Sequence, residues 1–292
     1  LWLGLAGHFL GYNTVFMWAW KYREPILDLF EMITGNRNSY AMFKVGGVRR
    51  DIEKSKIPAI RKEMGVIRKK LDLLTGAVMD DPVIHARTKG VGILTRQDIV
   101  DYAAVGPTAR ASGVDIDVRR DDPYAAYPLV NWKVITAEAG DVFAKTEVRL
   151  LEMYESASII EQCLDALEKL EEGNIALKIK EIPAGIGTGR AEAPRGEVFH
   201  FVVSDGSNSP ARHKIRAPSY TNIATFKKSC VGQTIADATI SLAAVDPCYC
   251  CTERMAAAYD RSSGEKILNA NELIEISMKR TEELRKSEAG HE

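Results

Sequence analysis

The feature that most constrains the fold is a helical repeat of apolar residues between positions 57 and 74. Steps of three and four residues alternate between Ile57, Ile60, Met64, Ile67, Leu71 and Leu74, and lysines and arginines lie between them. This spacing places the six side chains on one stripe of an α-helix. Pro58 falls in the first turn, where proline is tolerated. The segment therefore predicts an amphipathic helix of several turns that packs against other helices.

Two further segments predict long helices. Residues 142–170 carry an inner face of Ile160, Leu164, Leu167 and Leu170, with Gly173 just past the end, and glycine commonly follows a helix terminus. The opening segment, extended to about Thr34, also predicts a helix. We expect these helices to pack against one another.

The first twenty residues are long enough to span a bilayer, but their composition argues against it. The stretch LWLGLAGHFLGYNTVFMWAW contains His8, Asn13, Thr14 and three glycines, and charged residues follow at once. A buried core helix is the better interpretation. A signal peptide is excluded because a basic leading region and a cleavage site are both missing. Since the chain begins with Leu inside a helical pattern, we expect it to be part of a longer polypeptide.

The remaining segments predict a small β portion and shorter elements. Residues 104–127 hold too many glycines and prolines for regular structure and too many apolar residues for disorder. Residues 198–204 and 211–216 predict a β-hairpin. Residues 222–244 predict a further helical stretch, and 271–292 an exposed helix. The predicted fold class is mainly α (α+β), with long packed helices and a small antiparallel β portion near 195–217.

Composition limits the possible functions. Hydrophobic residues make up 46% of the 292 positions, which is enough for a large core. The net charge of −1 gives no electrostatic reason to expect nucleic-acid binding. Five cysteines is an odd number without a disulfide-framework spacing, which indicates a reducing compartment and thiols that serve as metal ligands or redox groups.

The cysteines concentrate in one short segment, DPCYCC. Cys248 and Cys251 have the C-x-x-C spacing, which lets two thiolates from one turn reach the same soft metal ion. One such pair is half of a tetrahedral site. We expect Cys163 and Cys230 to be structural and assign no role to Cys250. Three histidines, His8, His85 and His200, are also expected to be core or structural residues rather than ligands.

The segment DPCYCCTER resembles the carboxy-terminal nickel-binding signature of [NiFe]-hydrogenase large subunits, in which Asp-Pro-Cys-x-x-Cys-x-x is followed by His or Arg. The Arg form is typical of the membrane-bound, energy-converting group. Blocks of the formate hydrogenlyase large subunit and its archaeal relatives resemble LGLAGHFLGYNTVFMWAWKYRE, ITGNRNSYAMFKVGGVRRDI, VGPTARASG and AEAPRGEVFH in the same order. The quinone-site 49 kDa subunit of respiratory complex I shares this ancestry but lacks the cysteines. The resemblance implies a fold like that of [NiFe]-hydrogenase large subunits.

The resemblance also implies roles for particular residues. Cys248 would be a terminal thiolate on nickel, and Cys251 would bridge nickel to an iron that carries carbonyl and cyanide ligands. The other two thiolates come, in the family, from an earlier C-x-x-C that this chain does not contain. Arg195, beside Pro194, would extend over the open side of the metal pair, and Asp246 would orient it. Without the resemblance, Arg195 is a surface residue after a proline turn and Asp246 a helix N-cap.

The resemblance implies partners and processing as well. The implied partners are a small subunit with a [4Fe-4S] cluster and ion-pumping membrane subunits. These subunits would hold the chain peripherally at the cytoplasmic face of the membrane. The resemblance implies no nucleotide cofactor. In the family a maturation protease cuts after the closing His or Arg. The catalytic domain would then be 1–254 and the extension 255–292. Because the tail is present, the chain is either a precursor or a relative that is not processed.

Three functions remain open on this basis. The first is the large subunit of an energy-converting [NiFe]-hydrogenase that reduces protons with electrons from an iron–sulfur partner. The second is the homologous subunit of a membrane-bound sulfane sulfur or polysulfide reductase, in which the thiols would do dithiol chemistry. The third is a non-catalytic electron-transfer subunit.

Overall fold

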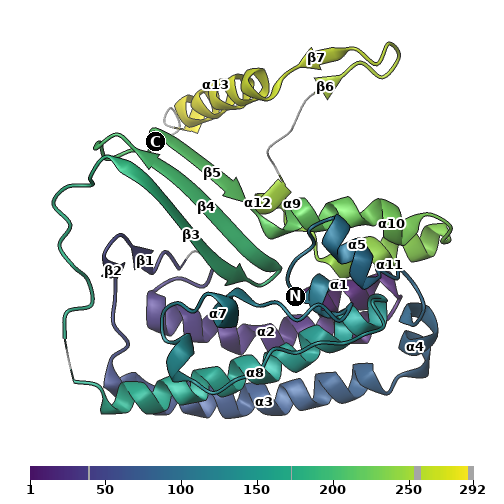
Figure 1. The fold of residues 1–292 in the computed structure, drawn as a ribbon, viewed down its shortest axis with the longest axis horizontal. Helices are drawn as coiled ribbons and strands as arrows, with labels where there is room; N and C mark the ends of the chain where they lie inside the picture. Colours follow the sequence, from purple (N-terminus) through teal and green to yellow (C-terminus); the bar gives the residue numbers. More distant parts are fainter. Residues whose placement is uncertain (39, 172, 253–257, 289–292) are drawn as a thin grey trace. The chain divides into compact units, whose positions relative to one another are not determined.

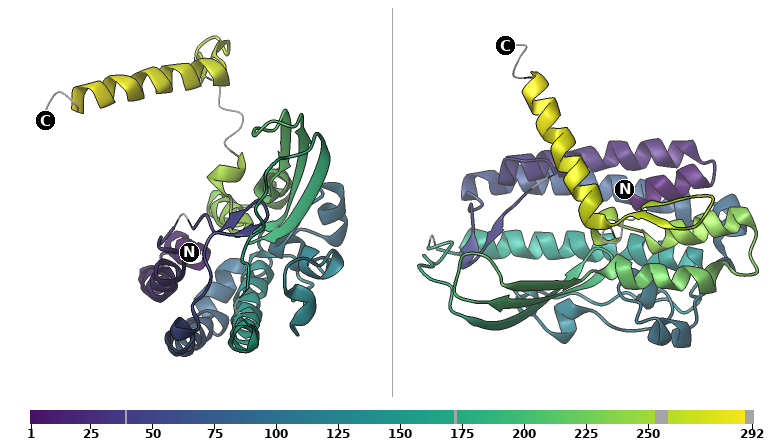
Figure 2. Two further views of the ribbon diagram at one scale, coloured as in Figure 1. Left: turned by 90° about the vertical axis from the view of Figure 1, so that its left-hand side faces the viewer. Right: turned by 90° about the horizontal axis from the view of Figure 1, so that it is seen from above.

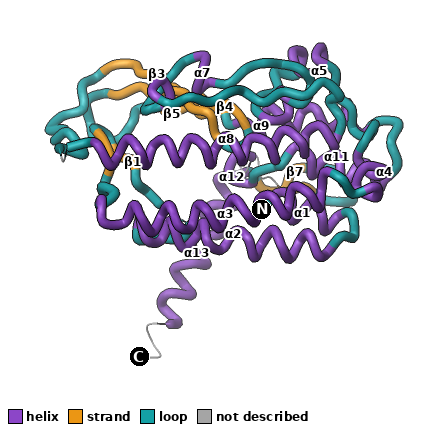
Figure 3. The backbone as a smooth tube through the Cα atoms, turned by 90° about the horizontal axis from the view of Figure 1, so that it is seen from below, coloured by secondary structure: helices purple, strands orange, loops and turns teal. Residues whose placement is uncertain are grey.

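Long helices form the body of the structure, a computed structural model that describes residues 1–38, 40–171, 173–252 and 258–288. The described residues divide into two compact units, Leu1–Pro247 and Cys248–Glu292. In the first unit α2 (Asn13–Thr34), α3 (Ile57–Met79) and α8 (Val142–Lys169) run side by side (Figures 1 and 3). The predictions of α3 and α8 as helices are confirmed. The predicted inner face of α8 is only partly correct, because Leu164 is buried and Leu167 half-buried, whereas Ile160 and Leu170 are exposed.

The apolar stripe of α3 forms the seam between these helices. One buried cluster combines residues of α2, α3 and α8, namely Leu29, Ile57, Ile60, Met64, Ala157 and Leu164. Each of these side chains is buried, and the burial of a Leu, Ile or Met contributes about 1.5 to 3 kcal/mol. The expected packing of the long helices is therefore confirmed.

The prediction of one continuous opening helix is wrong. α1 (Trp2–Phe9) and α2 are separate helices, and Gly11 between them has a φ of 77°, a conformation that ends a helix and suits glycine. The two helices fold back on each other closely. A Cβ added at Gly4 would lie 3.1 Å from the Cβ of Ala19, so the small residue allows the contact. Among the described residues, no helix is both long enough and apolar enough to span a bilayer.

A three-stranded antiparallel sheet lies over one side of the helical layer (Figures 1 and 2). Its strands are β3 (Gly185–Ala193), β4 (Gly196–Ser204) and β5 (Arg212–Arg216), in that order. The predicted hairpin corresponds to β4 and β5 and is confirmed. β3 was not predicted, because its sequence GIGTGRAEA is rich in residues that are depleted in strands. A two-residue hairpin, β1 (Phe43–Lys44) and β2 (Gly47–Val48), lies apart from this sheet.

Short helices fill the segments between these elements. The first group is η1 (Lys54–Lys56), α4 (Pro82–Thr88), α5 (Arg96–Asp101), α6 (Pro107–Arg110), α7 (Val118–Asp121) and η2 (Tyr127–Leu129). The segment predicted to be irregular thus contains two helical turns, α6 and α7. It is packed as expected, since Ala109 and Arg110 are both buried.

The stretch predicted as one helix from 222 to 244 is interrupted. It comprises α9 (Pro218–Asn222), η3 (Ile223–Thr225), α10 (Phe226–Cys230) and α11 (Ile235–Val245). The break before α11 has two local causes. Gly232 adopts a φ of 87°, and the side chain of Thr234 accepts a hydrogen bond from the Asp237 N–H as the N-cap of a new helix.

The second unit contains α12 (Tyr249–Thr252), a short hairpin of β6 (Ala258–Tyr259) and β7 (Lys266–Leu268), and α13 (Ala270–Glu288). The predicted helix in the tail is confirmed as α13 over its described part. The predicted domain boundary after Arg254 falls among residues 253–257, outside the described residues, and stays a prediction.

Candidate functional site

Arg195 lies in a two-residue turn that joins β3 to β4. The strand register pairs Ala193 with Gly196, so Pro194 and Arg195 form the whole connection. Proline fixes its own φ and thereby stiffens the turn. The Arg195 guanidinium extends from it to Asp246. Nε donates to the Asp246 carbonyl oxygen at 2.7 Å, and Nη2 donates to Oδ1 at 3.1 Å.

Asp246 is placed to receive this arginine because it ends α11. Its φ and ψ of 59° and 62° are left-handed, a conformation that Asp tolerates better than most residues, and its N–H donates to Ala243 O at 2.9 Å. The alternative interpretation of Asp246 as an N-cap is wrong, since it is a C-cap. The Asp246 carboxylate also lies 3.0 Å from Arg195 Nε. The structure thus brings the predicted Arg195 and Asp246 together, while their role beside a metal stays a prediction.

The turn that carries Arg195 is packed against a loop at Val105 and Gly106. A Cβ on Gly106 would lie 2.5 Å from Arg195 O, so only glycine allows this approach. Asn222, fully buried at the end of α9, donates from Nδ2 to Arg195 O at 3.1 Å. Sequence reasoning missed Asn222. The sequence signals were the glycines in VGP and PRG, which suggest tight backbone contacts but do not identify the partner.

The cysteine pair belongs to the second unit and follows Asp246 with only Pro247 between. Cys251 N–H donates to Cys248 O at 3.0 Å, which closes the first turn of α12. Both cysteines are half-buried, whereas Cys250 is exposed. Residues three apart on a helical turn lie on the same face. Among the described residues, no group of three or more His, Cys, Asp or Glu side chains is arranged to hold a metal ion.

The isolated cysteines have the environment of structural residues. Cys163 is half-buried, and burial raises the pKa of its thiol. Cys230 is half-buried too. Burial likewise raises the pKa of its thiol, and its Sγ lies 3.7 Å from Ala238 O. Thiols with raised pKa values are poor nucleophiles and weak metal ligands at neutral pH.

The histidines make local contacts. His8 is exposed, and its Nδ1 lies 3.2 Å from Asn13 Oδ1. His85 is half-buried, with Nε2 at 2.6 Å from Met79 O. His200 and His213 approach each other across β4 and β5 at 2.9 Å. His8 is exposed and therefore not a core residue, while the structural role expected of all three histidines stays a prediction.

Two basic residues of α8, the buried Lys145 and the half-buried Arg149, contribute to the electrostatics of the first unit. Lys145 is fully buried and donates from Nζ to Gly92 O at 2.8 Å; burial, and then the charge of Arg149, lower its pKa to about 7. Burial also lowers the pKa of Arg149 to about 10, opposed by the charge of Asp246. Arg149 thus carries a positive charge close enough to Asp246 and Arg195 for each of them to shift its pKa.

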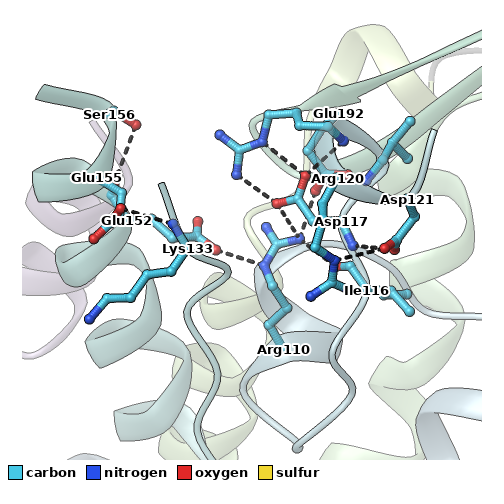
Figure 4. A network of polar contacts seen from close by, with 12 residues as sticks. Arg110, Ile116, Asp117, Arg120, Asp121, Lys133, Glu152, Glu155, Ser156 and Glu192 are labelled. Carbon is cyan, nitrogen blue, oxygen red and sulfur yellow. Dashed lines mark hydrogen bonds and ion pairs between the residues drawn. The ribbon is translucent and has the colours of Figure 1, made fainter. Parts of the chain in front are cut away.

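A buried ion network anchors β3 to the helices (Figure 4). Arg110 is 2% exposed and donates from Nε to Glu152 at 2.7 Å and from Nη1 to Glu192 at 2.8 Å, and Asp117 lies at 3.4 Å. Burial raises the pKa of Glu192, while the charge of Arg110 opposes the rise. Glu192 precedes Arg195 by three residues, so the network fixes the strand that carries the turn.

Comparison with known proteins identifies the family. The family model described as "Respiratory-chain NADH dehydrogenase, 49 Kd subunit" matches residues 10–182 and 174–254. The membrane-bound hydrogenase subunit alpha of Pyrococcus furiosus is 34% identical, over 97% of this chain and 69% of that protein. Formate hydrogenlyase subunit 5 of Escherichia coli K12 is 33% identical, over 95% of this chain and 48% of that protein. The chain thus spans about half to about two thirds of the length of these relatives.

A solved structure agrees with this assignment. It is titled "Structure of the membrane-bound sulfane sulfur reductase (MBS), an archaeal respiratory membrane complex", with 31% sequence identity and a TM-score of 0.80 over 85% of this chain and 68% of that chain. The predicted mainly α fold with a small antiparallel sheet is confirmed. The chain belongs to the family that comprises the 49 kDa subunit of respiratory-chain NADH dehydrogenase and the large subunits of [NiFe]-hydrogenases.

Proposed function

We propose that this chain is the large subunit of a membrane-bound, ion-pumping [NiFe]-hydrogenase complex, which reduces protons to hydrogen with electrons from a neighbouring iron–sulfur subunit. The observation that supports this most is the Arg195–Asp246 pair, whose Asp246 lies two residues before Cys248 of the C-x-x-C in the chain. A fixed cation and two thiolates are among the groups that a nickel–iron site requires of its protein.

The donor set of α12 fits half of a [NiFe] centre. Cys248 and Cys251 would hold it as terminal and bridging thiolates, respectively, and the remaining thiolates would come from an earlier C-x-x-C, as the resemblance implies. Thiolates are soft ligands that suit nickel and iron. The bound centre supplies the redox chemistry of hydrogen. This chain's own contribution is to hold the thiolates one turn apart and to set the charge around them.

Arg195 would bind an anionic ligand of the centre. Asp246 engages Nε and Nη2, and Nη1 has no acceptor within the described residues. The Arg195 side chain is 24% exposed and that of Asp246 16%, so the pair is partly screened from water. Nη1 is therefore the donor that can hold a cyanide ligand or assist proton movement. Asp246 restrains the guanidinium while it does so.

The names of the relatives support the proposed setting. One relative is called a membrane-bound hydrogenase subunit, and the similar solved structure is titled as an archaeal respiratory membrane complex. We place the chain at the cytoplasmic face of the membrane, held by a small [4Fe-4S] subunit and by ion-pumping membrane subunits. A maturation protease would cut after Arg254 if the chain is processed. The proposal includes no nucleotide and no nucleic-acid partner.

A second candidate function has specific support. The similar solved structure is that of a sulfane sulfur reductase. Polysulfide is anionic, and the guanidinium of Arg195 suits it as well as it suits a metal-bound anion. In that case the chain would belong to the homologous subunit of a membrane-bound sulfur reductase.

Turnover assays on the complete complex separate these functions. Hydrogen evolution and polysulfide reduction are measured with the same electron donor for the wild type, Cys251→Ser and Cys250→Ser. We expect Cys251→Ser to abolish hydrogen evolution in a complex that still assembles, and Cys250→Ser, an exposed neighbour, to retain it. Unchanged evolution by Cys251→Ser would rule out the bridging role. Polysulfide reduction without hydrogen evolution would favour the second function. A complex that shows neither activity and contains no metal would favour a non-catalytic subunit.

A further inference from the structure

We propose that Asn222 is a positioning residue for Arg195. Its buried side-chain amide joins the turn that carries Arg195 to the loop at Val105. Asn222, the turn and the loop are three separate segments of the sequence. The inference rests on the proposed function for what Arg195 does in turnover. The contacts of Arg195 with Asp246, Asn222 and Gly106 all lie within the first unit.

The side-chain amide of Asn222 makes three hydrogen bonds. Oδ1 accepts from Val105 N–H at 2.9 Å, and Nδ2 donates to Val105 O at 3.2 Å and to Arg195 O at 3.1 Å. Asn222 is fully buried, and Thr225 Oγ1 donates to its backbone oxygen at 2.6 Å. A buried amide whose donors and acceptor are satisfied defines one geometry, because any displacement leaves polar groups unpaired.

Two glycines bring the segments into direct contact. A Cβ on Gly196 would lie 2.6 Å from Val105 Cγ2, and a Cβ on Gly106 would lie 2.5 Å from Gly196 Cα. The turn therefore rests directly on the loop, and the amide of Asn222 connects their carbonyl groups at this contact. No room remains for the turn to shift toward the loop.

Arg195 is consequently held at both ends. Asn222 fixes its backbone carbonyl, and Asp246 fixes its guanidinium. The direction of Nη1 depends on both anchors. If Asn222 is removed, the turn loses its buried anchor while the bond to Asp246 remains, so the guanidinium is displaced rather than released.

The decisive experiment is a double-mutant cycle in the complete complex. Asn222→Ala, Arg195→Lys and the double variant are compared for kcat, KM and metal content. A displacement of about 1 Å at a catalytic group costs up to about 100-fold in rate, so we expect Asn222→Ala to lower kcat by roughly 10- to 100-fold with metal retained. The double variant should be no slower than Arg195→Lys, because both changes act through one side chain. Additive losses would overturn the proposal.

A matched control separates positioning from stability. Thr88 is a buried residue whose hydroxyl bonds to Ile84 O, remote from Arg195 in the sequence and with no contact to its turn. Thr88→Ala should lower the melting temperature and leave kcat unchanged. If Thr88→Ala lowers kcat as much as Asn222→Ala does at an equal loss of stability, Asn222 has only a structural role.

A second variant keeps the claim testable if Asn222→Ala does not fold. In Asn222→Asp, the neutral acid can accept from Val105 N–H and donate to one carbonyl, whereas the ionised carboxylate repels both carbonyls. Its kcat should therefore rise on acidification relative to the wild type. A parallel pH profile would contradict the positioning role.

The structure of the Asn222→Ala complex distinguishes failure of this inference from failure of the proposed function. If Arg195→Lys has normal turnover, the proposed role of Arg195 fails. The positioning role is then tested by the backbone of the Arg195 turn alone. In the Asn222→Ala structure this turn must lie farther from Val105 than in the wild type. An unmoved turn would overturn it.

Discussion

Replacing Lys145 by methionine tests the electrostatics of α8 most quantitatively. Lys145 is fully buried, and burial lowers its pKa from 10.5 to about 7. A pKa that falls by one pH unit corresponds to about 1.4 kcal/mol, so the charged form is penalised by at most roughly 5 kcal/mol. Methionine has a similar length and no charge. It loses only the hydrogen bond to Gly92 O, which contributes roughly 1 kcal/mol.

The sign of the pH dependence follows from the lowered pKa. Because the pKa of Lys145 is lower in the folded chain, the unfolded chain binds more protons between pH 7 and 10.5. The free energy of unfolding should therefore gain up to about 1.4 kcal/mol per pH unit from this group within that window. Below pH 7 both states are protonated, and the contribution no longer changes.

The assay is urea unfolding of the wild type and Lys145→Met at pH 7.5 and 9.5. We compare the free energy of unfolding of Lys145→Met with that of the wild type at each pH. Because the wild type gains stability as the pH rises, this difference should fall by roughly 2 to 2.7 kcal/mol between pH 7.5 and pH 9.5. Lys133→Met, at an exposed position, is the control and should show little difference at either pH. A Lys145→Met difference that stays constant across the window would refute the reasoning, because it would mean that burial does not perturb this amine.

Three further substitutions test other parts of the structure. Arg195→Lys should slow turnover greatly with nickel retained, because a point-charge ammonium cannot reproduce the planar fork; near-normal rates, measured with metal analysis, would remove Arg195 from the mechanism. Arg110→Met leaves three carboxylates without their buried cation and should cost about 3 to 5 kcal/mol in urea unfolding. The exposed pair of Arg190 and Asp122 gives the comparison, since Arg190→Met should cost less than about 1 kcal/mol, and equal losses would contradict the burial argument. Gly106→Ala should destabilise the chain and displace the Arg195 turn, since its φ is 68° and the added Cβ meets backbone; wild-type melting would argue against that close contact.

The long helices could be predicted because their signal is local. The stripe of α3 is visible in its own sequence. The extent of α8 was visible too, but two residues of its predicted inner face, Ile160 and Leu170, are exposed. The break at Gly11 has a local cause too, but a single glycine inside an apolar run does not by itself indicate whether a helix stops. β3 could not be predicted, because its glycine-rich sequence forms a strand only through pairing with β4.

The candidate site divides in the same way. Arg195 and Asp246 were found through their motifs, although 51 residues separate them and no periodicity indicates their contact. Asn222 was not found, because its partner Val105 lies 117 residues away and its burial depends on the packing of α9. Contacts of this kind depend on tertiary structure, which local propensity does not encode.

The central claim is that Cys248 and Cys251 hold nickel, and the metal content of the complete, assembled complex tests it most directly. Elemental analysis should find about one nickel ion per chain in the wild type, because two thiolates one turn apart select a soft metal. Cys248→Ser should lose that nickel, and Cys250→Ser should keep it. A complex that turns over with no nickel, or a Cys248→Ser variant with full nickel content, would contradict the account.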